Sequence, residues 1–142
     1  MSEISVGVKK LVFGLTLLLS MFLSVGCTLS PEDKVAREQA LKQTVETFAE
    51  SVVQGKWNDL YTMSDGGFDG AEKLKAHLTQ TWVSDATLTA GQIASRAWIN
   101  DGLAKVKLNW TFQSGSVQSF SSETFSWVWK GNAWKYQGRV LR

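Results

Sequence analysis

The order of apolar and polar residues divides the chain into a helical first part and a β-rich second part. Within residues 31–55 the apolar positions recur at intervals of four, three and four, which places them along one side of a helix. These positions are Leu41, Val45, Phe48 and Val52. Shorter helical patterns follow at residues 57–61 and 71–82. The pattern therefore predicts three helices before about residue 85.

The residues at the ends of these segments are types that start or stop helices. Ser30 can act as an N-cap, Pro31 suits the first helical position, and Asp33 completes a pattern like a capping box. Gly55 is a suitable C-terminal stop for the first helix. Asp69 is expected to cap the third helix.

From about residue 86 onward the period changes to two, which is typical of half-buried strands. The clearest strand is residues 104–112, where the even-numbered residues are apolar and the odd-numbered residues are polar. Glycine-containing turns at residues 100–102, 113–116 and 130–132 separate the strands from one another. The pattern predicts about four consecutive antiparallel strands.

Two strands do not follow a simple alternation. Phe120 falls on an even number and Phe125 on an odd one, so a bulge or break is expected between them. Trp98 is in phase with Arg96 but out of phase with Ile93, which predicts that its side chain points away from the helices. Trp98 and Arg96 are therefore possible ligand or interface residues, and ordinary packing is the alternative for Trp98.

Helices followed by consecutive antiparallel strands indicate an α+β fold, in which the N-terminal helices pack on a curved sheet of about four strands. Phe48 and Trp110 are expected to be buried and to face one another across the interface between helix and sheet. Most of the seven Trp residues are expected to fill this core.

The first 26 residues have the features of an export signal. Lys9 and Lys10 precede an uncharged, strongly apolar stretch, and small residues lead to Cys27. The sequence "LSVGC" resembles the lipobox of bacterial lipoproteins, in which a peptidase cuts before the cysteine and the sulfur carries a diacylglycerol. The resemblance implies a signal peptide over 1–26, lipidation at Cys27 and a lipidated tether over 27–32.

This segment also determines the expected location. A transmembrane helix needs about 20 apolar residues, so an uncleaved membrane anchor is an alternative to lipidation. In lipoproteins an Asp after the cysteine retains the protein at the inner membrane, and here that position is Thr28. The resemblance therefore implies a lipid anchor in the bacterial cell envelope, at the periplasmic face of the outer membrane rather than at the inner membrane.

Composition limits the chemistry of the remaining domain. With one Cys and one His in 142 residues, the sequence offers no internal disulfide and no residue spacing typical of a metal site, and no cofactor is expected. The net charge is +2 with both signs mixed along the chain, so the clustered basic face of a nucleic-acid-binding protein is not expected.

Two stretches resemble the ends of nuclear transport factor two-like domains. "FAESVVQGKWNDLYTMSD" is similar to their opening helices, and "FSWVWKGNAWKYQGRVL" is similar to their closing hairpin. The resemblance covers about residues 33–142 and implies a cone in which the sheet wraps around the first helix. Members of that superfamily include ketosteroid isomerases, scytalone dehydratases and polyketide cyclases, together with binding and association modules that are often dimeric through the sheet. A cystatin-like sheet on a single helix is the nearest alternative.

His77 and Glu123 are the weak catalytic candidates. His77 lies beside the apolar stripe of the third helix, Glu123 is an isolated acid in a strand, and neither has a partner visible in the sequence. Without an identifiable acid–base pair, we expect both to be dispensable and favour a non-enzymatic binding or assembly module. Its partners would be the membrane, a second copy or an envelope protein through the sheet, or a small apolar ligand. A small-molecule isomerase or dehydratase is the alternative.

Overall fold

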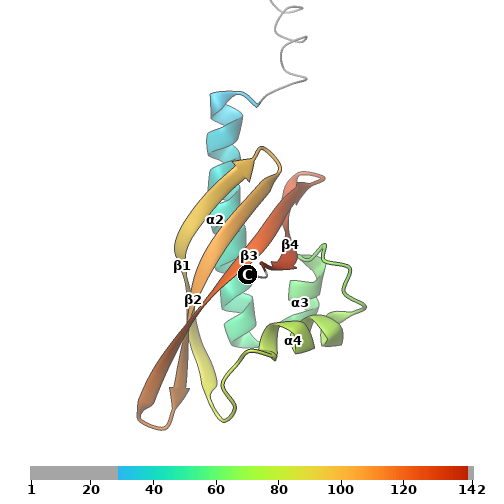
Figure 1. Ribbon diagram of the computed structural model, residues 1–142. Coiled ribbons are helices and arrows are strands. Elements are labelled where there is room, and N and C mark those ends of the chain that lie inside the picture. Colours follow the sequence, from blue (N-terminus) through green and yellow to red (C-terminus); the bar gives the residue numbers. More distant parts are fainter. Residues whose placement is uncertain (1–28, 141–142) are drawn as a thin grey trace, which may run out of the picture. The chain divides into compact units, whose positions relative to one another are not determined.

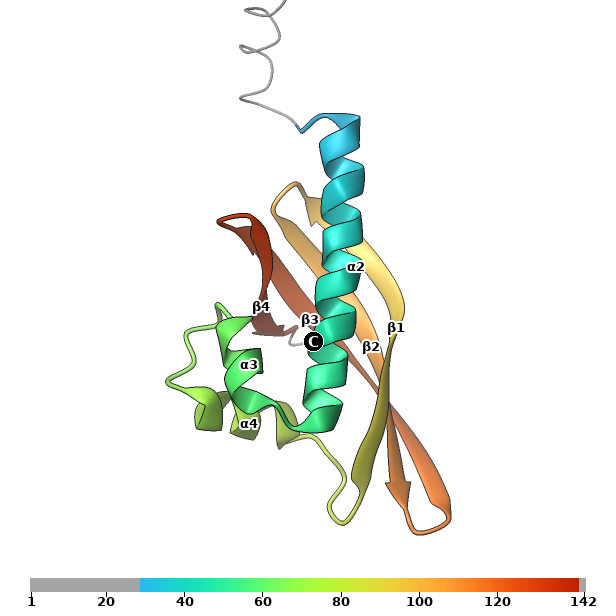
Figure 2. The same cartoon turned by 180° about the vertical axis from the view of Figure 1, so that it is seen from behind.

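The computed structural model describes residues 29–140 and confirms the α+β class. The elements are α2 (Pro31–Gln54), α3 (Trp57–Thr62), α4 (Ala71–Thr79), β1 (Thr87–Asn100), β2 (Leu103–Ser114), β3 (Val117–Lys130) and β4 (Ala133–Arg139). The strands form one antiparallel sheet in the order β1-β2-β3-β4 (Figure 1). Figure 2 shows α2 lying across one face of this sheet, with α3 and α4 beside the C-terminal half of α2.

The described residues divide into two units, residues 29–35 and residues 36–140. In the first unit, the backbone N–H of Asp33 donates to Ser30 Oγ at 3.2 Å, which confirms Ser30 as a cap at the start of α2. The predicted signal peptide and Cys27 lie outside the described residues.

The other predicted helix ends had mixed outcomes. Gly55, at a φ of 70°, follows the last residue of α2 and donates its N–H to the Val52 carbonyl at 3.1 Å, which confirms the stop. The prediction that Asp69 caps α4 is wrong. The N-cap is Gly70, which has a φ of 91° and makes no side-chain capping bond.

The core lies between α2 and the inner face of the sheet. The alternation predicted for β2 is confirmed, because its even-numbered residues Ala104, Val106, Leu108, Trp110 and Phe112 are all buried. Phe48 and Trp110 are buried as expected, with 0% and 1% of their surface exposed. However, the ring contacts of Phe48 are with Phe125, Trp127 and Tyr136 rather than with Trp110.

The predicted outward direction of Trp98 is wrong. Irregularities between Leu88 and Ala90 and between Ile93 and Ser95 shift the phase of β1 along its length. Trp98 therefore pairs with the buried residue Ala104, and paired residues share a face of the sheet. Its half-buried indole packs edge-on against Trp134, with ring centroids 5.3 Å apart.

The bulge expected between Phe120 and Phe125 is also absent from the pairing with β2. That pairing is continuous from Leu103↔Val128 to Ser114↔Val117, and the irregularity in β3 lies on its other side, between Ser126 and Trp127. Phe120 instead points outward and is 72% exposed. Because the register is unbroken, Glu123 lies on the same inner face as Phe125.

The two edges of the sheet differ. On the β4 side, the chain around Ser64 pairs with Tyr136. The N–H of Asp65 donates to the carbonyl oxygen of Tyr136, and the N–H of Tyr136 donates to that of Met63, both at 2.7 Å. On the other side, β1 is the last strand within residues 29–140. One edge is therefore paired with the chain itself at Tyr136, and β1 forms the other edge.

Candidate functional site

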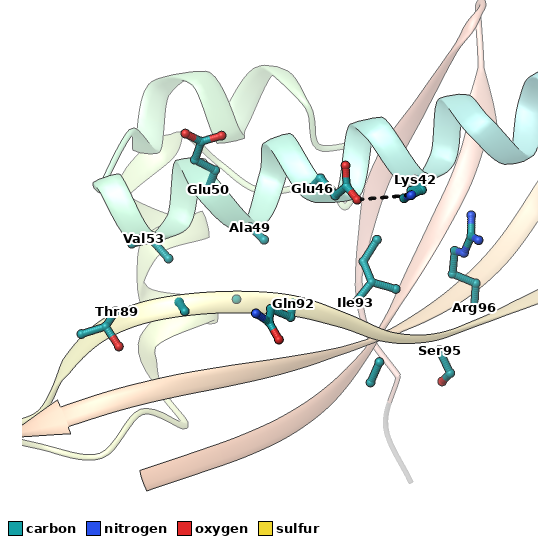
Figure 3. A pocket seen from close by; sticks show the side chains of 13 residues that line it. Lys42, Glu46, Ala49, Glu50, Val53, Thr89, Gln92, Ile93, Ser95 and Arg96 are labelled. Atoms are coloured by element: carbon teal, nitrogen blue, oxygen red, sulfur yellow. Dashed lines mark ion pairs between the residues drawn. The ribbon is translucent and has the colours of Figure 1, made fainter. Parts of the chain in front are cut away.

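A groove of about 870 Å³ lies between α2 and the edge strand β1 (Figure 3). Its lining consists of Lys42, Glu46, Ala49, Glu50 and Val53 from α2, and residues 89–96 from β1. This volume is within the range of about 300–1,000 Å³ that is typical of ligand pockets. The groove is therefore the principal candidate for binding in the described part of the chain.

Small residues bring the helix and strand together along the base of the groove. A Cβ atom added to Gly91 would lie 2.4 Å from Cζ3 of Trp110 and 3.2 Å from Cβ of Ala49. The absence of a side chain at Gly91 thus allows the buried Trp110 ring to lie directly against β1. Val53 and Ile93 are partly buried against the same core and make the base apolar.

Charged side chains form the rim and are unevenly distributed. Lys42 and Glu46 form a long ion pair of 3.9 Å, and both side chains are 56% exposed. Farther along α2, Glu50 accepts a hydrogen bond from Gln54 at 3.1 Å. Arg96 lies on the Lys42 side of the groove (Figure 3), so one end carries a second cation beside the Lys42–Glu46 pair, and the other end carries the Glu50 carboxylate. Exposed ion pairs are weak, so these charges can be recruited by a ligand.

Arg96 and Trp98, the predicted ligand or interface pair, both face the helix. The Arg96 guanidinium lies 3.5 Å from the Glu38 carbonyl oxygen, and a small hollow of about 140 Å³ is lined by Glu38, Leu41, Arg96, Ala97 and Trp98. The structure thus places Arg96 at the groove but uses Trp98 in packing. The sequence did not reveal this because the irregularities in β1 change the face on which each residue lies.

The structure also gives Glu123 a partner that the sequence did not. Glu123 Oε1 lies 3.4 Å from Nε of Arg139, and these side chains are only 9% and 12% exposed. Thr81 donates a hydrogen bond to the same carboxylate oxygen. Arg139 also donates to the carbonyl oxygens of His77 and Leu78, at 3.2 and 3.5 Å, near the end of α4. Glu123 therefore has partners in the fold that are not visible in the sequence.

His77 belongs to the same partly buried cluster. Its Nε2 lies 3.1 Å from the hydroxyl oxygen of Tyr136, and its ring is 4.9 Å from that of Phe68. Burial, and next the positive charge of Arg139, lower the pKa of His77, while Glu123 opposes them. Burial raises the pKa of Tyr136 above its ordinary value. At neutral pH the cluster thus contains an uncharged imidazole and an uncharged phenol.

This cluster, which consists of His77, Thr81, Glu123, Tyr136 and Arg139, links α4 to β3 and β4. None of its members lines the groove between α2 and β1. Tyr136 is fully buried, and the Arg139 guanidinium donates hydrogen bonds to carbonyl oxygens near the end of α4. Two features of the sequence could have indicated this cluster. Arg139 is a charged residue in the last strand, and Glu123 lies two residues from the apolar Phe125, which places both on the same face of the strand.

Two kinds of feature are absent from residues 29–140. No three or more His, Cys, Asp or Glu side chains are grouped so that they could hold a metal ion. In the same range, every helix is too short or too polar to cross a membrane.

Comparison with known proteins supports the fold alone. No family model matches the chain, and no curated protein matches its sequence. Among solved structures, Aln2 from a Streptomyces species is similar, with a TM-score of 0.52 and 12% sequence identity, over 80% of this chain and 91% of Aln2. At this identity the likeness shows a related α+β arrangement.

Proposed function

We propose that this chain is a lipid-anchored, non-enzymatic binding module of the bacterial cell envelope. Its domain would be of the nuclear transport factor two-like type and would bind its partner in the groove between α2 and β1. The observation that carries the proposal is that groove of about 870 Å³, with an apolar base and a charged rim. An apolar base with a few polar groups around it is the usual chemistry of binding sites.

The separation between groove and cluster favours binding over catalysis. The rim groups Lys42 and Glu46 face solvent, so their surroundings resemble those of ordinary surface charges. The titratable residues with buried partners, His77 and Glu123, lie outside the groove and connect α4 to the sheet. General acid–base catalysis requires such groups to be within reach of a bound substrate.

The membrane anchor is proposed from the sequence around Cys27. Lipidation there would hold the domain stably at a membrane, because one lipid chain binds marginally but two or more bind stably. Thr28, in place of an Asp after the cysteine, is the reason to propose the periplasmic face of the outer membrane. Mass spectrometry of the mature N-terminal peptide should find an acylated Cys27. An intact N-terminus at Met1 with an unmodified thiol would contradict the anchor, and Cys27→Ala should leave the domain folded but uncut.

Photo-cross-linking in intact cells tests the groove. A benzoylphenylalanine introduced at Glu46 would point into the groove, and one at the neighbouring exposed residue Thr47 would point elsewhere on α2. A discrete cross-linked product from position 46, and none from position 47, is the expected result. Equal products from both positions, or products from position 47 alone, would show that binding does not use the groove.

A small-molecule isomerase or dehydratase is the second candidate. The observation in its favour is Glu123 Oε2, which is buried and has no hydrogen-bond partner within residues 29–140. Buried, unsatisfied polar atoms are uncommon and are found at catalytic positions. This candidate requires Glu123→Gln to abolish function in a chain that remains folded and abundant.

A further inference from the structure

We propose that the groove binds an extended peptide, which adds a strand to the free edge of β1. The peptide would carry an acidic side chain beside Lys42 and Arg96, and a basic side chain beside Glu50. The inference rests on the proposed function, since it names the ligand of the same groove.

The first support is the difference between the two edges of the sheet. The β4 edge is already hydrogen-bonded to the chain around Ser64, whereas β1 has no further strand beside it in the described range. Proteins usually protect a free edge with charges, proline or β-bulges, and β1 has irregularities on both sides of the stretch from Ala90 to Ile93. The sequence of β1, TLTAGQIASRAWIN, contains Arg96 as its one charged residue and no proline. Between its irregularities, residues Ala90 to Ile93 pair regularly with β2.

The second support is that this regular stretch forms one wall of the groove, while α2 forms the other. A groove between a strand and a helix suits an extended peptide. The strand provides main-chain hydrogen bonds, and pockets beside it accept alternate side chains. Side chains of the peptide that point toward α2 would contact Ala49, Val53 and Ile93, which form the apolar base.

The third support is the order of charges along the rim. Lys42, Glu46 and Glu50 are spaced by successive intervals of four residues, so Lys42 and Glu50 are about 12 Å apart along α2. An extended chain covers that distance in about four residues. Side chains four residues apart in a strand also lie on the same face. The acidic and basic side chains should therefore occupy positions i and i+4 of the peptide.

The direction of the peptide follows from the geometry of β1. Figure 3 shows that α2 and β1 run in opposite directions, with Arg96 near Lys42 and Thr89 near Val53. Antiparallel pairing is slightly more stable than parallel pairing. A peptide antiparallel to β1 begins near Arg96 and ends near Thr89. The acidic residue should thus precede the basic one.

The test uses the full-length, isotope-labelled chain in detergent micelles and a capped pentapeptide, acetyl-Asp-Thr-Val-Thr-Lys-amide, whose central valine lies on the same face as the two charges. We expect saturable chemical-shift changes at Ala90 to Ile93 and at Glu50, and weaker binding of the reversed peptide, acetyl-Lys-Thr-Val-Thr-Asp-amide. Glu50→Lys should weaken binding of the first peptide about two- to fivefold, which is the usual range for an exposed ion pair. Replacing the peptide lysine by Asp should restore binding to the Glu50→Lys variant. Lys107→Gln, on the outer face of β2, is the matched control and should change nothing.

Methylation of the peptide backbone distinguishes strand addition from other ways of filling the groove. In an added strand, alternate N–H groups point toward β1. N-methylation of the amides that point toward β1 should abolish binding, and N-methylation of the amides that point away from β1 should leave binding intact. No saturable binding at millimolar peptide, or equal binding of both methylated forms, would overturn the inference. Dimerisation of the chain through β1 in place of peptide binding would also overturn it.

These outcomes are separable from those for the proposed function. If the peptides fail but position 46 still cross-links in cells, the groove remains the binding site and the peptide inference alone is wrong. If both fail, the proposed function is wrong as well.

Discussion

Removing the charge of Glu123 while keeping its shape, as in Glu123→Gln, tests whether the cluster around Glu123 and Arg139 holds the domain together. The mutation leaves Arg139 charged at a position where its side chain is only 12% exposed. Breaking one partner of a buried ion pair costs about 3–5 kcal/mol. Arg139 keeps its hydrogen bonds to the carbonyl oxygens of His77 and Leu78, so the lower end of that range, about 3 kcal/mol, is expected.

Urea unfolding followed by tryptophan fluorescence measures this loss directly, because the chain has seven Trp residues and several are in the core. With a slope of about 1–3 kcal/mol per molar urea, the midpoint should fall by about 1–3 M. Glu72→Gln is the matched control, since Glu72 is exposed on α4, and it should change stability by less than about 0.5 kcal/mol. The double variant Glu123→Met/Arg139→Met should be more stable than Glu123→Gln, because it leaves no unpaired buried charge.

Two results would refute this reasoning. If Glu123→Gln unfolds at the same urea concentration as Glu72→Gln, the pair does not connect α4 to the sheet. If Glu123→Gln is as stable as the unmodified chain but has lost its cellular function, Glu123 acts chemically and the enzyme candidate becomes the better one.

Two further predictions concern residues whose surroundings the sequence did not reveal. Trp98→Ala should lower the free energy of unfolding by about 2 kcal/mol, roughly half the cost at a fully buried aromatic, because Trp98 packs on Trp134, and an unchanged urea midpoint would contradict this. The pKa of His77 is lowered from 6.5 in the folded chain, so the unfolded chain binds the proton more tightly. The free energy of unfolding should therefore fall as the pH drops below about 6.5 and level off below the folded-state pKa, and His77→Gln should flatten this dependence in urea titrations at several pH values.

The parts of the fold that could be predicted from the sequence are those set by local patterns. The stripe on α2 and the alternation in β2 identified buried faces correctly, because a regular helix or strand fixes the direction of every side chain. The Ser30 cap and the Gly55 stop were likewise predictable from residue type.

Apart from the Asp69 cap, the errors arose where the geometry depends on a partner strand. Trp98 faces the helix because irregularities in the pairing of β1 with β2 change its phase, and no residue type in β1 announces them. Phe120 suggested a bulge in β3, but an unbroken register leaves it simply exposed. A residue that looks out of phase can therefore indicate an exposed side chain as readily as a distorted strand.

The candidate site was least accessible to sequence reasoning. Glu123 and Arg139 are brought together by the pairing of β3 with β4, and His77 reaches Tyr136 across a long separation in the chain. The groove needs α2 and β1 side by side, and its narrow base depends on the close approach of Trp110 to Gly91. None of these contacts is encoded in a local motif.

The central claim, that partners bind in the groove and not at the cluster around His77 and Glu123, is tested most directly by one comparison. The yield of the cross-linked product from position 46 in intact cells should be measured in Glu50→Lys and in His77→Gln, each at normal abundance. Binding in the groove predicts that Glu50→Lys lowers the yield, because Glu50 lines the groove, and that His77→Gln leaves it unchanged. A yield that survives Glu50→Lys but is lost in His77→Gln would contradict the claim.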